Sequence, residues 1–163
     1  MGDRDDFHND MSLLVCDDRT ETLYFVSKPF GIVRAFTADG AERWRVELPD
    51  FVPMNVALGS GGCCRYGGPA NPLGGSVDQV RGLALDEEGR LLVGLQRSEY
   101  RRATRTGGTY ELRVLDPRTG GVIARQRTEG AVVGIAAGKV YLYVEGGPDA
   151  QGPHHVEVHS LTD

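Results

Sequence analysis

The chain has 163 residues and a formal net charge of −5, and 40 % of its residues are hydrophobic and 25 % charged. These proportions are ordinary for a globular protein, so they exclude a disordered, collagen-like or coiled-coil chain. The longest uncharged apolar stretch, residues 131–138, is far shorter than the roughly 20 residues that cross a bilayer. The first ten residues carry four acidic side chains and no apolar run, so we do not expect a signal peptide. We therefore expect a polar tail over residues 1–11 and one globular domain over 12–163, in the cytoplasm.

The charges and cysteines indicate which partners and which cysteine-based sites the sequence does not favour. An acidic chain is a poor general binder of nucleic acid, and nothing in it indicates a membrane. All but two of the 18 basic residues are arginines, a bias that a GC-rich coding sequence explains as well as anion binding does. The three cysteines (Cys16, Cys63 and Cys64) are an odd number without a CxxC spacing, so they imply neither a disulfide framework nor a zinc ribbon.

Alternating apolar and polar residues predict strands along most of the chain, as in residues 43–48 and 110–114. Turns rich in Asp, Pro and Gly separate these runs, for example at 86–89 and 116–120, where Asp accepts backbone hydrogen bonds and Gly adopts a positive φ. No long amphipathic helix is visible, so we expect an all-β chain. The spacing predicts eleven strands, at residues 12–16, 22–28, 31–37, 42–48, 80–86, 90–96, 109–115, 121–128, 131–136, 139–145 and 154–161.

The strand pattern also repeats. The run Val80–Val93 recurs as Val132–Leu142, and a looser copy precedes both at Ser12–Val26. Each unit contains two hairpins, and four-stranded repeats of about 40–50 residues are typical of β-propeller blades. The alternative is a two-sheet sandwich whose hairpins are similar by chance.

Two of these hairpins resemble a known family. Residues 33–45 and 115–120 resemble the hairpin between the third and fourth strands of six-bladed, NHL-like or pyrroloquinoline-quinone-type β-propellers. The resemblance implies a partial β-propeller of about 2.75 four-stranded antiparallel blades. Its parts would be blade one at 12–48, a long inter-blade loop at 49–79, blade two at 80–128 and an incomplete blade three at 131–161.

A propeller of fewer than four blades leaves blade faces and strand edges uncovered. Propellers close with four to eight blades, and an uncovered strand edge favours aggregation. We therefore expect the chain either to associate with a second copy or to be part of a longer polypeptide.

The three longest connections, at 49–79, 97–108 and 146–153, fall on the same face of the expected fold. Long loops are often functional, although insertions are also simply tolerated there. Arginine binds carboxylates and phosphates in a planar, bidentate geometry, and tyrosine offers a stacking surface. We expect this face to bind an anionic small molecule or an acidic protein segment, unless its arginines are merely solvated. The candidate binding residues are Arg65, Tyr66, Tyr100, Arg101, Arg102 and Arg105.

A cysteine pair and a histidine-rich strand could each be a functional site or a feature without a functional role. By the same resemblance, the adjacent Cys63 and Cys64 could form the strained ring found in quinone-dependent propeller dehydrogenases, or they could be free thiols. On a strand, His155, Glu157 and His159 point to one side, as metal ligands or as surface residues.

No pattern of catalytic residues stands out in the sequence. We therefore expect a binding or scaffold module without catalytic residues, metal or cofactor. The alternative is part of a propeller enzyme, either a metal-dependent lactonase-like hydrolase or a quinone-dependent dehydrogenase.

Overall fold

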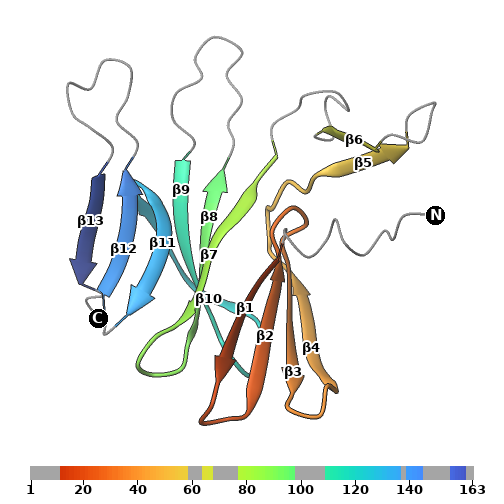
Figure 1. The fold of residues 1–163 in the computed structure, drawn as a ribbon, viewed down its shortest axis with the longest axis vertical. Helices are drawn as coiled ribbons and strands as arrows, with labels where there is room; N and C mark the ends of the chain where they lie inside the picture. Colours follow the sequence, from red (N-terminus) through yellow and green to blue (C-terminus); the bar gives the residue numbers. More distant parts are fainter. Residues whose placement is uncertain are drawn as a thin grey trace.

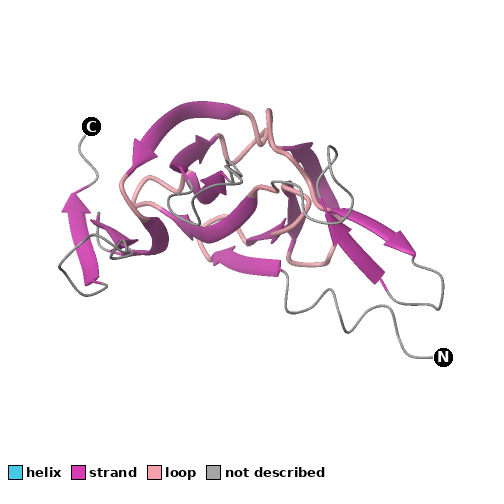
Figure 2. Cartoon of the chain, turned by 90° about the horizontal axis from the view of Figure 1, so that it is seen from above, coloured by secondary structure: helices cyan, strands magenta, loops and turns pink. Residues whose placement is uncertain are grey.

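The computed structural model describes residues 12–58, 64–67, 77–97, 109–136, 139–144 and 155–160. This part of the chain contains thirteen strands and no helix, and hence no helix that could cross a membrane (Figures 1 and 2). The all-β prediction is confirmed, and each of the eleven expected strands is present with both ends within one residue of the expected ones.

Eleven of these strands form three antiparallel sheets in which neighbours in the chain are neighbours in the sheet. Sheet I contains β1 (Ser12–Asp17), β2 (Thr22–Ser27), β3 (Ile32–Thr37) and β4 (Glu42–Glu47). Sheet II contains β7 (Gln79–Leu85), β8 (Leu91–Arg97), β9 (Thr109–Leu115) and β10 (Val122–Thr128). Sheet III contains β11 (Ala131–Ala136), β12 (Lys139–Val144) and β13 (His155–Ser160). The unit expected over 80–128 is therefore one four-stranded sheet, and its hairpins do not divide between two facing sheets.

The connection between sheets I and II differs from the expected loop at 49–79. It contains a two-stranded ladder of β5 (Asn55–Leu58) and β6 (Cys64–Gly67). The surrounding glycines conceal it in the sequence, because glycine is depleted in strands and signals a turn.

The turn chemistry is as the sequence predicts. Asp86 Oδ1 accepts hydrogen bonds from the backbone N–H groups of Glu88 and Arg90, at 3.0 and 2.8 Å. Gly89 and Gly120 close the β7–β8 and β9–β10 turns with φ values of 81° and 73°. Only glycine adopts such angles without steric cost, so both hairpin registers are set locally.

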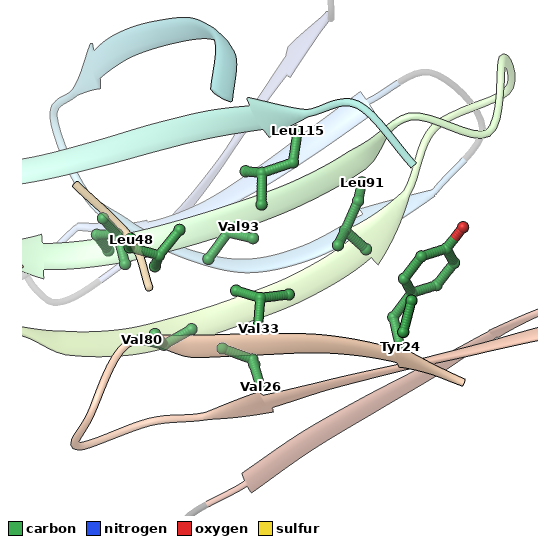
Figure 3. Packing of buried hydrophobic residues seen from close by; sticks show 10 residues of the cluster. Tyr24, Val26, Val33, Leu48, Val80, Leu91, Val93 and Leu115 are labelled. Atoms are coloured by element: carbon green, nitrogen blue, oxygen red, sulfur yellow. The ribbon is translucent and has the colours of Figure 1, made fainter. Parts of the chain in front are cut away.

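Sheet II lies between the other two sheets (Figure 1). Its first strand, β7, packs against the first strands of both neighbours, β1 and β11. One apolar cluster fills the space between sheets I and II, where Leu91, Val93 and Leu115 face Val26 and Val33 (Figure 3). A second cluster joins sheets II and III, and its buried members are Leu92, Leu112, Val132, Val140 and Leu142.

This stacking explains the burial along the central strands. In β8 every residue from Leu91 to Leu95 is buried, because both faces of sheet II are covered. In β2 and β12 burial alternates with a period of two, because only one face of each sheet is covered.

Charged side chains are also buried between sheets I and II. Arg113 on β9 is fully buried, and its Nε lies 2.6 Å from Glu111 Oε1. Its Nη1 donates to the carbonyl of Pro49 at 2.6 Å, while its Nη2 has no hydrogen-bond partner among the described residues. Next to this pair, Arg97 lies 3.1 Å from the buried carboxylate of Asp78. Because a buried charge is costly without a partner, each arginine is paired with a carboxylate within sheet II or beside it. The hydrogen bonds that Arg113 and Arg97 donate to the carbonyls of Pro49 and Asp50 then join sheet II to the segment that follows β4.

Candidate functional site

The six binding residues expected from the sequence lie in the connections between sheets and strands. Arg65 and Tyr66 belong to β6, where they pair with Ala57 and Val56 of β5. The other four candidates lie outside the described residues: Tyr100, Arg101, Arg102 and Arg105. A ligand site formed by these six residues therefore stays a prediction.

The stack of sheets has two ends with different connections (Figure 1). At one end, which we call the long-connection end, β8 and β12 finish and β9 and β13 begin. At the opposite, short-turn end lie the β1–β2, β3–β4, β7–β8 and β9–β10 turns. The long connections therefore leave from the same end, as expected.

A pocket of about 480 Å³ opens at the short-turn end, between sheets I and II. Its volume lies within the range of small-molecule sites, roughly 300–1,000 Å³. Sheet I contributes Asp17, Arg19, Thr20, Thr22, Tyr24 and Arg43, and the turns of sheet II contribute Glu88, Gly89, Pro117 and Arg118.

The sheet I wall of the pocket is fixed by its own hydrogen bonds. The buried carboxylate of Asp17 accepts from the backbone N–H of Arg19 at 3.1 Å and from the Thr20 hydroxyl at 2.9 Å. The Arg19 Nε lies 3.2 Å from the same carboxylate. These contacts hold the β1–β2 turn and direct the Arg19 guanidinium toward sheet II.

Two side chains of sheet I bridge to the turns of sheet II. Arg19 Nη1 donates to the carbonyl of Glu87 at 2.9 Å, and Trp44 Nε1 donates to the carbonyl of Pro117 at 2.9 Å. Trp44 also packs near Tyr24, with ring centroids 6.0 Å apart. These two hydrogen bonds therefore fix the β1–β2 turn and β4 relative to the β7–β8 and β9–β10 turns at the pocket.

The polar groups of the pocket favour an anion. Three arginines line it against two carboxylates, although the chain as a whole is acidic. Arg118 is exposed, and the described residues give its guanidinium no ion-pair partner. Burial, and then the negative charge of Asp17, raise the pKa of Tyr24 above its ordinary value. The Tyr24 hydroxyl therefore stays protonated and can donate a hydrogen bond.

The Asp17 carboxylate is expected to make the stability of the chain depend on pH. Burial raises the pKa of Asp17, but hydrogen bonds from Thr20 and Arg19 outweigh it and leave that pKa below its ordinary value. A carboxylate whose pKa is lower in the folded state stabilises the fold above its ordinary pKa, about 4, and this contribution is lost as the pH falls through the folded-state pKa. Urea unfolding should therefore show a smaller loss of stability below pH ~4 for Asp17→Asn than for the unchanged chain. Equal losses would contradict this assignment.

The histidine pattern forms a local cluster on β13. His155 Nε2 and His159 Nε2 lie 3.0 and 2.9 Å from the two carboxylate oxygens of Glu157, between them. The hydrogen bonds from His159 and then His155 lower the pKa of Glu157. No group of three or more His, Cys, Asp or Glu side chains that could hold a metal ion occurs within the described ranges.

The cysteines fall in two places. Cys16, on β1, is a free, exposed thiol. Cys64 begins β6, and Cys63 lies outside the described residues. The choice between a Cys63–Cys64 ring and free thiols therefore stays open.

No family model matches the chain, and neither does any curated protein.

Sequence reasoning did not anticipate the pocket at the short-turn end. Its arginines, at positions 19, 43 and 118, lie on different strands or turns of two sheets. Only the stacking of sheets I and II brings them together. The one pocket residue that the sequence could have marked is an aspartate at the start of a turn, such as Asp17. Aspartate is common at that position because it forms the turn, so it does not indicate a ligand.

Proposed function

We propose that the chain is a non-enzymatic, β-propeller-type binding module, cytoplasmic as the sequence leads us to expect, in which sheets I, II and III are successive blades. Each sheet is an antiparallel meander, and sheet III has three strands where sheets I and II have four. The contacts of β7 with β1 and β11 support this arrangement, because the first strands of successive blades lie side by side around a propeller axis.

The ligand we propose is an anionic small molecule or the acidic segment of a partner protein, bound in the pocket between sheets I and II. The observation that carries this proposal is that Arg19, Arg43 and Arg118, with Tyr24, line a single pocket. Arginine stays charged at any physiological pH and binds carboxylates and phosphates through two parallel hydrogen bonds. A pocket so lined suits a carboxylate or phosphate group better than a neutral one.

Paired substitution of Arg43 and Arg118 by alanine is expected to weaken anion binding by more than tenfold. Each charge-assisted contact contributes about 1.5–3 kcal/mol, and 1.4 kcal/mol corresponds to a factor of ten in affinity. The binding of inorganic phosphate and of an oligoglutamate peptide, followed by titration calorimetry, measures the effect. Arg45→Ala is the matched control, because Arg45 is an exposed arginine of β4 that does not line the pocket.

Three results would contradict the proposed site. One is the absence of saturable binding of either probe, and another is an affinity that the paired substitution leaves unchanged. The third is a loss of binding in Arg101→Ala with Arg102→Ala but not in the pocket variant. That last result would assign the site to the long-connection end, as expected from the sequence.

A further inference from the structure

The two end sheets of the stack each have a face that no other described sheet covers. On sheet I this face carries Leu23 and Phe25 of β2 and Leu14 of β1, which pairs with Phe25. On sheet III it carries Tyr141 of β12 and Val158 of β13, which pair with each other. The solvent-exposed face of an antiparallel sheet normally carries polar side chains, whereas the side chains at these positions are apolar or aromatic. Leu14 and Val158 are 62 % and 52 % exposed.

The residues of sheets II and III that correspond to Leu23 and Phe25 in the repeat are buried, because each of these sheets has a preceding sheet packed on it. On the face of sheet II toward sheet I, Leu91 and Val93 are the counterparts of Leu23 and Phe25 in the repeat, and both are fully buried. In sheet III the counterparts are Val140 and Leu142, which are buried against sheet II. The outer face of sheet I therefore carries the residue types that elsewhere receive the preceding sheet.

The outer face of sheet III has the complementary character. In the repeat, Tyr141 of β12 corresponds to Tyr24 of β2 and Leu92 of β8. Both of these residues are buried against the following sheet. Sheet III thus ends the stack with a face suited to a further sheet, and sheet I begins it with a face suited to a preceding one.

We infer that a second copy of this chain covers both faces, with sheet III of each copy packed on sheet I of the other. Two copies supply six sheets, within the four to eight of closed propellers, whereas three copies would supply nine. The inference rests on the propeller part of the proposed function and is independent of the anion pocket. The two can therefore fail separately.

The molecular mass in solution tests this inference. Size-exclusion chromatography with light scattering should give twice 17.7 kDa, or 35.4 kDa, for the unchanged chain. Leu14→Arg and Val158→Arg each place a charge in the contact and should return the mass to 17.7 kDa. Both side chains are more than half exposed in the single chain, so the fold should survive, as circular dichroism would verify. Ile123→Arg is the control, because Ile123 is 58 % exposed but belongs to β10 of sheet II.

Mixing the two variants separates this contact from other ways of covering the faces. A pair made of one Leu14→Arg and one Val158→Arg chain retains one unaltered contact, so the mixture should recover part of the 35.4 kDa species. No recovery would indicate that like faces pair with each other and would overturn the inference. A mass of 17.7 kDa for the unchanged chain would also overturn it, since no second copy would then cover either face.

Discussion

Glu111→Ala is expected to lower the free energy of unfolding by about 3–5 kcal/mol, the usual cost of breaking a buried ion pair from one side. The substitution leaves the Arg113 guanidinium fully buried without the carboxylate that lies 2.6 Å from its Nε. The Arg113 Nη2 already has no hydrogen-bond partner among the described residues, so no other hydrogen bond of this guanidinium makes up for the lost carboxylate. Urea unfolding, followed by the fluorescence of Trp44, the only tryptophan, measures the change.

Two controls distinguish a buried charge from a general loss of contacts. Glu42→Ala removes a half-exposed carboxylate paired with Arg34 and should cost less than about 1 kcal/mol. Combining Glu111→Leu with Arg113→Met removes both charges and should recover much of the loss, because a well-packed apolar pair is often as stable as a buried ion pair. If Glu111→Ala costs no more than Glu42→Ala, Glu111 does not compensate the buried charge of Arg113.

Gly94→Ala and Gly82→Ala are expected to destabilise the contact between sheets II and III. A Cβ at Gly94 would lie 2.6 Å from the Cβ of Val132, and one at Gly82 would lie 2.7 Å from the carbonyl oxygen of Val132. Overpacking of this kind costs about 1–3 kcal/mol, and more where a backbone atom must move. Thermal or urea unfolding measures both losses. Gly134→Ala is the matched control, because its nearest neighbour, in Tyr141, would be 4.0 Å away.

A second substitution at Val132 separates the two glycines. Val132→Gly removes the atom that Gly94→Ala meets, so the double variant should be less destabilised than the sum of the single changes. The same substitution leaves the backbone carbonyl in place and should not rescue Gly82→Ala. Equal rescue of both, or none of either, would contradict the close approach of β7 and β8 to β11.

The strands and turns that the sequence predicted correctly depend on patterns among neighbouring residues. The period-two alternation within 43–48 and 110–114 depends only on neighbouring residues, as does the turn chemistry at Asp86 and Gly89. The pairing of β1 with β2, β3 with β4, β7 with β8 and β9 with β10 followed because short turns allow only antiparallel neighbours to pair. The β5–β6 ladder was missed, since its residues lie in a glycine-rich stretch without alternation.

The rest depends on contacts between distant segments. The pocket combines Arg19 with Arg118, which are 99 positions apart in the chain, and nothing local marks either as a ligand residue. Gly94 interrupts an apolar run in β8, and only the position of Val132 explains it. The ion pair of Arg113 was similarly invisible, because an arginine in an alternating strand normally faces water.

Small-angle X-ray scattering tests the stacking of the sheets and its closure by a second copy most directly. Closure predicts a mass of twice 17.7 kDa, or 35.4 kDa, that stays constant as the protein concentration rises. It also predicts a radius of gyration of about 20 Å, the value for a compact particle of that size. A mass that climbs with concentration would indicate an open stack of sheets. A constant mass of 17.7 kDa with a radius of about 15 Å would contradict association altogether.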